Sequence, residues 1–197
     1  MKTLLIMQVH IMSARHNRRM AHGPSGFSLI EQVMVLAILA VLTSLAVPSL
    51  SKVLGSNQLQ VAQTDFITAL LHARETAVVS GKRTLFCPTL DGHRCSDDTR
   101  WDSGWLLGHD SDGDQQPDNG ALYVGHGYTG KVKIRSSAGR HAVRFNPDGS
   151  AGGSNLTLLF CAQGDAASAL SVVVSNSGRT RGAPASRDQS LGCAQSL

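Results

Sequence analysis

The sequence predicts an α+β protein in which one long N-terminal helix precedes a head built of β-strands. Three observations support this prediction. An apolar run covers residues 27–47, a helical apolar period continues from residue 59 to residue 77, and short apolar segments alternate with turn residues over the rest of the chain. The 197 residues suffice for one domain with a sizeable core, and no internal repeat is present.

Residues 1–26 are basic and end in small residues. Three arginines lie between positions 15 and 19, and the segment closes with GPSG, which is typical of a cytoplasmic leader peptide. In an ordinary secretory signal the small residues follow the apolar core, whereas here Gly26 precedes it. Cleavage after Gly26 would therefore leave the apolar helix on the mature protein.

Residues 27–47 contain one charged residue, Glu31. A helix of this length covers about 31 Å at 1.5 Å per residue, which is the thickness of a bilayer's hydrocarbon core. We therefore expect residues 27–54 to form a transmembrane and assembly helix. A carboxylate within such a span costs about 2.5–3.5 kcal/mol by insertion scales, so Glu31 needs a partner or a function.

A second helical segment, residues 55–81, is amphipathic. Its apolar positions recur at steps of three, four and one, which places them on one face. These positions are Leu59, Ala62, Phe66, Ala69, Leu70, Ala73 and Ala77. Ser80 and Gly81 then end the helix, and we expect this stem to pack on a globular head of residues 82–197.

The head is predicted to contain seven short strands between turn residues. They cover residues 83–87, 104–107, 121–124, 131–135, 142–146, 156–161 and 170–175. The residues after 175 are poor in apolar side chains, so we expect them to form an exposed C-terminal tail.

The four cysteines lie in a part of the chain that the predicted anchor places outside the cytoplasm, which favours two disulfides. Three pairings are possible. We favour Cys87–Cys95, which closes a short loop, and Cys161–Cys193, which ties the tail to a strand. A zinc site is the competing interpretation, but no two cysteines have the two-to-four-residue spacing of zinc ligands.

The net charge of +4 comes from the leader, because four of the 18 Lys and Arg residues precede position 27 and leave 14 to balance 14 Asp and Glu. The remaining chain is nevertheless polarised. Residues 91–118 contain eight acids and two bases, whereas residues 131–187 contain eight bases and two acids. An anionic partner would be attracted to the second region.

Residues 26–31, GFSLIE, resemble the type IV prepilin signature. In that family a prepilin peptidase cuts after the glycine and methylates the new N-terminus, so the resemblance implies cleavage after Gly26 and methylation of Phe27. It also implies that Glu31 neutralises the terminal amine of a neighbouring subunit in a filament. The implied location is the inner membrane, as a single-pass protein with a periplasmic head, and the extracellular pilus after assembly. A plain membrane anchor is the alternative.

Two further segments are similar to the FimT and GspH group of minor pilins and pseudopilins. They are LHARETAVVSGKRTLFCP at residues 71–88 and WDSGWLL at residues 101–107. Heads in this group pack two antiparallel β-sheets against the stem helix. The resemblance therefore implies a two-sheet head, and it is closest to the FimT type.

The tail contains GRTR at residues 178–181, which is the main candidate for a binding site. The planar fork of arginine binds phosphate oxygens in pairs. The segment resembles the GRxR element of FimT-type minor pilins, which bind DNA for uptake in natural transformation. This resemblance assigns DNA binding to Gly178, Arg179 and Arg181, and Arg187 is the next candidate. No aromatic residue accompanies them, so we expect non-specific backbone contacts to double-stranded DNA.

Two alternatives for the basic residues stay open. The arginines of the tail could lie on a solvated turn of a structural, GspH-like pseudopilin at the tip of a type II secretion pseudopilus, which would bind only other subunits. Lys131, Lys133 and Arg135 alternate with aliphatic residues, so they share one strand face and could widen a DNA footprint.

The acidic segment 110–118 has the beginning of a calcium-loop pattern. Asp110, Asp112, Asp114 and Asp118 occupy positions one, three, five and nine. The bidentate Glu expected at position twelve is Ala121, and the glycine comes at position four instead of six. The pattern leaves open a calcium loop and a solvated acidic hairpin, and it favours the hairpin, so we expect no metal and no cofactor.

Catalytic motifs are absent from the sequence. It contains no HExxH, P-loop, dinucleotide fingerprint or nucleophile elbow, and the histidines after the leader are scattered. We therefore expect a protein that is not an enzyme and is instead a substrate of the prepilin peptidase.

Overall fold

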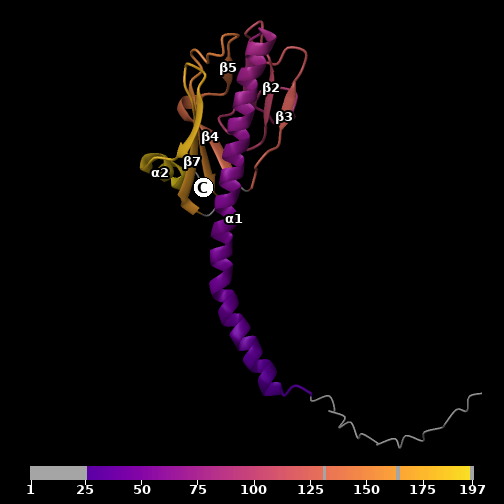
Figure 1. Cartoon of the computed structure of the whole chain (residues 1–197), viewed down its shortest axis with the longest axis vertical. Coiled ribbons are helices and arrows are strands. Elements are labelled where there is room, and N and C mark those ends of the chain that lie inside the picture. The colour runs from indigo at the N-terminus through magenta and orange to yellow at the C-terminus, as the bar shows by residue number, and fades with distance from the viewer. Residues whose placement is uncertain (1–25, 131, 163–164, 196–197) are drawn as a thin grey trace, which may run out of the picture. The chain divides into compact units, whose positions relative to one another are not determined.

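The computed structural model describes residues 26–130, 132–162 and 165–195 (Figure 1). Most of the predicted leader, residues 1–25, and Lys131 lie outside the described residues. The chain divides into two compact units, Met1–Ser44 and Leu45–Leu197.

Helix α1 extends from Leu29 to Ser80. Ser28 caps its N-terminus, because the Glu31 amide donates to the Ser28 Oγ at 3.3 Å, and Glu31 lies in the first turn, where the helix dipole favours a carboxylate. The described side chains of the first unit are exposed.

Within the described part of the chain, no helix has both the length and the apolar character needed to cross a membrane. The span predicted over residues 27–47 is therefore not confirmed.

In the second unit, α1 buries the face that the sequence predicts. All seven stem positions from Leu59 to Ala77 are at most 6% exposed. They belong to one core cluster with residues from two β-sheets, and α1 runs beside strands of both sheets in Figure 1. The amphipathic period therefore predicted the packing face correctly.

The head contains two four-stranded antiparallel sheets, which confirms the predicted α+β fold class. The first has the order β3 (Tyr123–Gly125), β2 (Trp105–His109), β1 (Thr84–Pro88) and β5 (Val143–Phe145). The second has the order β4 (Val132–Ser136), β6 (Leu156–Ala162), β7 (Asp165–Val174) and β8 (Thr180–Pro184). A short 3-10 helix, η1 (Ser137–Gly139), follows β4.

Phe66 of α1 joins the two sheets. Its ring lies 6.0 Å from the Phe86 ring of β1 and 5.3 Å from the Phe160 ring of β6, both edge to face. The rings of Trp101, Trp105 and Tyr128 are within 6.5 Å. Aromatic pairs at such distances add to the free energy of area burial, so Phe66 is the centre of the core.

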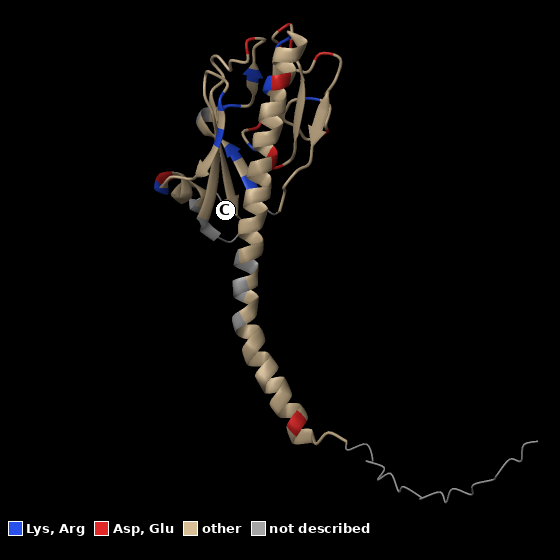
Figure 2. Cartoon of the chain, in the orientation of Figure 1, with Lys and Arg blue, Asp and Glu red and all other residues tan. Residues whose placement is uncertain are grey.

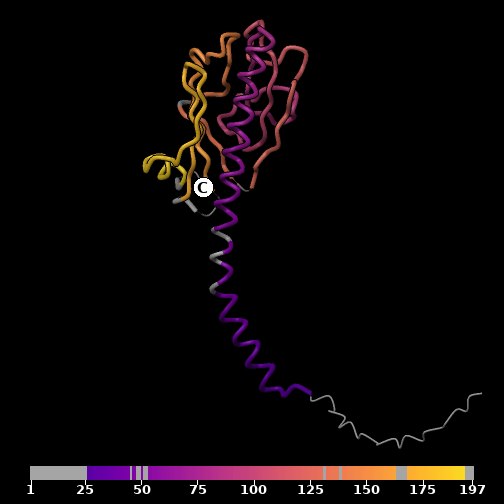
Figure 3. Tube along the Cα trace, in the orientation of Figure 1, coloured from indigo at the N-terminus to yellow at the C-terminus, as the bar shows by residue number. Residues whose placement is uncertain are grey.

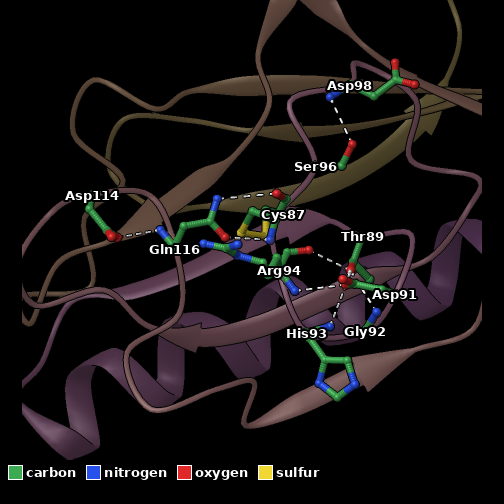
Figure 4. The surroundings of a disulfide bond; sticks show 11 residues. Cys87, Thr89, Asp91, Gly92, His93, Arg94, Ser96, Asp98, Asp114 and Gln116 are labelled. Carbon is green, nitrogen blue, oxygen red and sulfur yellow. Dashed lines mark hydrogen bonds between the residues drawn. A yellow bond between two sulfur atoms is a disulfide. The ribbon is translucent and has the colours of Figure 1, made fainter.

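Both disulfides have the pairing favoured from the sequence. Cys87–Cys95 closes a separation of 8 residues, and Cys161–Cys193 closes one of 32 residues. Chain-entropy estimates give each such loop about 2.5–4 kcal/mol of stabilisation. In the loop between Cys87 and Cys95, the Thr89 hydroxyl donates to Arg94 O, and the Asp91 carboxylate accepts from His93 N and Arg94 N (Figure 4).

The expected C-terminal tail after residue 175 contains a strand and a helix that the sequence pattern did not predict. Residues 180–184 form β8, which pairs with β7 along its length (Figure 3), and helix α2 (Arg187–Gln195) follows. Ser186 and Gln189 form a capping box at the start of α2, because each side chain accepts the other's backbone amide. β8 shows no apolar alternation, because its inward-facing Gly182 packs on Ile67 and its outward-facing Arg181 is exposed, and the sequence pattern therefore missed it.

Candidate nucleic-acid interface

The GRTR segment lies in the hairpin that joins β7 to β8. Gly178 N donates to Ser175 O at 2.8 Å, and Ser175 N donates to Arg179 O at 3.0 Å. The Ser175 Oγ also accepts from Arg179 N at 3.2 Å. These bonds close a tight turn, so Arg179 lies immediately before β8 and Arg181 lies in its second position.

Gly178 shapes this hairpin. It is buried, and its φ of +77° is left-handed, a conformation that favours glycine. A Cβ at this position would collide with the Gly149 carbonyl oxygen of the turn before β6 and would lie 3.1 Å from the Arg74 Nε. Arg74 of α1 donates to that same carbonyl at 2.9 Å. The close approach of two turns and α1 therefore holds the hairpin in place.

Strand register gives the direction of the two arginines. Arg181 pairs with Val173, and Gly182 pairs with Val172. A Cβ on Gly182 would meet Ile67 of α1 at 2.8 Å, so Gly182 faces the helix. Successive residues of a strand point to opposite faces, so Arg181, and Arg179 two residues before it, face away from α1.

Both arginines are exposed. Among the residues that the structure describes, neither guanidinium has a hydrogen-bond or ion-pair partner, and the ion pair that is present joins Arg100 to Asp98. No described acid therefore neutralises either arginine. The two guanidinium groups are available to an anion.

Arg181 lies on the outer face of the second sheet, which is the face turned away from α1. Further basic residues lie on this outer face at the other edge of the sheet, on β4. On β4, Lys133 pairs with Cys161 and Arg135 pairs with Leu159, and these face away from the core because Val132 and Ile134 are buried. Three strand spacings separate β4 from β8, which is about 14 Å. Figure 2 shows basic residues, in blue, on the strands of this sheet.

A cleft of about 400 Å³ lies on this face between η1 and the β7–β8 hairpin. Its lining includes Arg140, Thr157 and Val173, and Val173 is the strand partner of Arg181. Arg140 is held by a hydrogen bond from its Nη1 to Gly153 O at 2.8 Å. Arg140 lies between predicted strands without a recognisable motif, so the sequence alone does not indicate it.

The structure does not place Arg187 in the same element as the other two arginines. It is the first residue of α2 and is exposed beside Asp188. The Cys161–Cys193 disulfide attaches α2 to the second sheet. Arg187 therefore lies on a separate element, six residues beyond Arg181.

One acid lies in the turn that Gly178 contacts. Asp148 accepts from Ser150 N at 2.8 Å, and the hydrogen bonds from Ser150 hold the pKa of this exposed carboxyl below its usual value. Asp148 is therefore ionised at neutral pH, and it limits the positive potential at this end of the outer face.

The predicted processing site is accessible. Gly26 and Phe27 precede α1, and Phe27 is 75% exposed. Glu31 is also exposed, on the first turn of the helix. No described residue covers the bond between Gly26 and Phe27.

The head resembles solved minor pilins. FimU, a type IV minor pilin of Pseudomonas aeruginosa, matches with a TM-score of 0.55 at 18% identity over 65% of this chain and 90% of its own. A second crystal form gives a TM-score of 0.52 at 20% identity over 64% and 93%. The minor pseudopilin EpsH of Vibrio cholerae matches at 15% identity over 64% and 97%, with a TM-score of 0.47. The similarity to FimU supports the fold.

No curated protein sequence matches this chain significantly. The family described as type II transport protein GspH matches residues 62–178, a segment that ends just before Arg179. Because the match covers more than half of the chain and agrees with the fold, the protein belongs to the GspH family, within the FimT and GspH group of type IV minor pilins and pseudopilins.

Proposed function

We propose that this protein is a minor type IV pilin whose head binds double-stranded DNA non-specifically, for DNA uptake in natural transformation and for pilus biogenesis. One observation carries the proposal: Arg181 on the edge strand β8 and Arg179 just before that strand are both exposed and have no partner among the described residues. Their alternation in an extended strand puts the two side chains about 7 Å apart along the chain.

The binding mode follows from this arrangement. Each guanidinium can donate two parallel hydrogen bonds to phosphate oxygens. Gly178 is buried, so its part is to hold the turn and not to contact DNA. Arg135 and Arg140 extend the basic face, and Arg187 is an additional contact from α2. Without aromatic side chains among these bases, DNA sequence is not read.

Assembly depends on the other end of the chain. The prepilin peptidase cleaves after Gly26 and methylates Phe27, and Glu31 then pairs with the terminal amine of a neighbouring pilin subunit. The protein resides in the inner membrane, with its head in the periplasm, until it joins the pilus. The similar proteins are named as pilins and pseudopilins, and we infer that this chain is likewise not an enzyme.

Replacing Arg179 and Arg181 together with Gln is expected to weaken DNA binding about tenfold or more without unfolding the head, because both side chains are exposed. If the parent contacts two to four phosphates, a plot of the logarithm of its affinity against the logarithm of salt concentration should have a slope of about −2 to −4. In the double variant the magnitude of this slope should be smaller by about two. The parent should bind at roughly micromolar affinity or weaker. Gel-shift titrations of the full chain in detergent at several salt concentrations measure both quantities.

The matched control replaces Lys82 and Arg94 with Gln, which removes the same charge from exposed positions outside the second sheet. The control variant should bind as the parent does. If the Arg179 and Arg181 variant keeps the parent's affinity and salt slope, the β7–β8 hairpin is not the DNA site.

A second candidate function is a structural type II secretion pseudopilin whose head contacts only other subunits. The family match favours it, since the matched family is a type II transport family and the matched segment excludes both arginines. The parent chain would then show no salt-dependent DNA binding in the same titration.

The proposed processing has its own test. Gly26→Val should block cleavage, because the peptidase must accept the small residue before Phe27, and the unprocessed chain should accumulate in membranes. Mass spectrometry of the parent should find a mature N-terminus at methylated Phe27. Gly55→Val, a change of the same size at an open position, should be processed normally, and a parent N-terminus elsewhere would contradict the proposal.

A further inference from the structure

We propose that the loop of residues 110–118, at the end of β2, binds one calcium ion through the carboxylates of Asp110, Asp112 and Asp114. This metal site is independent of the proposed DNA contact, because the loop follows a strand of the first sheet, whereas the arginines belong to the second.

The three carboxylates have the spacing of a shared ion. One oxygen from each of Asp110, Asp112 and Asp114 lies within 4.8 Å of the other two. Calcium binds oxygen ligands at 2.3–2.6 Å, so oxygens around one ion lie at most about 5 Å apart. A single calcium ion therefore fits among all three.

Asp110 is the observation that points to a ligand. Its side chain is 0% exposed, and neither carboxylate oxygen has a hydrogen-bond partner. Its backbone is fixed, because Asp110 N donates to Arg83 O at 3.0 Å. A buried carboxylate without a partner is strongly unfavourable, and a cation held with Asp112 and Asp114 would satisfy it.

Nearby basic residues do not neutralise the cluster. Arg83 approaches the loop, since its Nη1 lies 3.1 Å from where a Gly113 Cβ would be, but among the described residues it forms no ion pair with these carboxylates. The pKa of a different acid, Asp118, is lowered mainly by hydrogen bonds from Ser111 and less by His109 and Lys82. Three carboxyl groups thus lie together without an ion-pair partner among the described residues.

The loop keeps oxygens available for a metal. Asp112 Oδ1 accepts from Asp114 N at 3.2 Å, and Asp114 Oδ1 accepts from Gln116 N at 2.8 Å. Each carboxylate therefore has a second oxygen that the turn does not use. Asp118 instead caps Ser111 N at 2.8 Å, so the ion would have three carboxylates and would complete its shell with backbone oxygens and water. Such a ligand set fits the weak range of extracellular calcium modules, about 0.1–1 mM.

Calcium binding would also stabilise the neighbouring loop between Cys87 and Cys95. The Gln116 side chain accepts from Cys95 N at 2.9 Å and donates to Cys95 O at 3.4 Å, next to the Cys87–Cys95 bond (Figure 4). Gln116 N also donates a hydrogen bond to Asp114 Oδ1. A calcium ion that fixes Asp114 would therefore also fix Gln116 and, through it, the disulfide loop. The ion should therefore stabilise the head as well as bind to it.

The test is titration of the full chain in detergent with calcium chloride at constant ionic strength, by calorimetry and by thermal unfolding. The parent should bind with a dissociation constant of about 0.1–1 mM, and 10 mM calcium should raise Tm by about 3–8 °C. The variant with Asp112→Asn and Asp114→Asn retains the turn acceptors, so it should fold, but it should bind calcium at least tenfold more weakly.

Asp97→Asn is the matched control, because Asp97 is an exposed acid outside the cluster, and it should respond to calcium as the parent does. The proposal is overturned if the parent shows neither heat nor a Tm shift up to 10 mM calcium. It is also overturned if the double variant responds like the parent, or if magnesium produces the same shift as calcium.

Discussion

Gly178→Ala is expected to lower the free energy of unfolding of the head by about 2–4 kcal/mol and to weaken DNA binding at the same time. An alanine at a φ of +77° is strained by about 1–2 kcal/mol, and its Cβ would displace the Gly149 carbonyl oxygen. That displacement would break the 2.9 Å hydrogen bond from Arg74, and α1 would lose this contact with the turn before β6. The hairpin that carries Arg179 and Arg181 would move.

Gly153→Ala separates the two contributions. Gly153 has nearly the same φ, +76°, but a Cβ there has no atom within 4 Å. This control should lose only the backbone strain, about 1–2 kcal/mol. Urea unfolding of both variants and the parent, followed by gel shifts, gives the comparison. Equal losses of stability would show that the close approach of the two turns is unimportant.

Phe66→Ala is expected to destabilise the head most, by about 3–5 kcal/mol. The ring is fully buried and lies between Phe86 of the first sheet and Phe160 of the second. Its removal leaves a cavity where α1 meets both sheets, and the surrounding rings cannot close it without leaving their own contacts. Since domains of this size are stable by about 5–15 kcal/mol, the variant should be close to unfolding at 37 °C.

Leu71→Ala on the same helix is the control for Phe66→Ala. Leu71 is 48% exposed, so its truncation should cost less than about 1 kcal/mol. Thermal unfolding followed by circular dichroism measures both losses. A loss below 1.5 kcal/mol for Phe66→Ala would contradict the central role of this ring in joining the sheets.

These two changes bear differently on function. Phe66 lies inside the head, whereas Gly178 acts on the surface hairpin, so Phe66→Ala should reduce DNA binding only in proportion to unfolding. Gly178→Ala should reduce it also in the protein that remains folded. Binding measured below the unfolding transition of each variant distinguishes the two effects.

Several features of this protein were determined by the sequence itself. The stem face from Leu59 to Ala77 was predicted residue by residue, because a helix against a core repeats its apolar positions every three to four residues. The seven predicted strands agree with the structure to within a few residues, since turn residues separate them, except that β7 begins at Asp165 and not at residue 170. Of three possible disulfide pairings, the one favoured from loop length and position is present.

Only the tertiary structure decided how the functional candidates are arranged. β8 has the sequence TRGAP, which shows no strand pattern, because its inner side is a glycine against Ile67 and its outer side faces solvent. The pairing of β8 with β7, and of β4 with β6, puts bases separated by more than 40 residues of sequence on one face. Likewise, the spacing of acids was visible in the sequence, but the burial of Asp110 was not. Local periodicity reports the environment of a single element, whereas register and burial depend on contacts between elements distant in the chain.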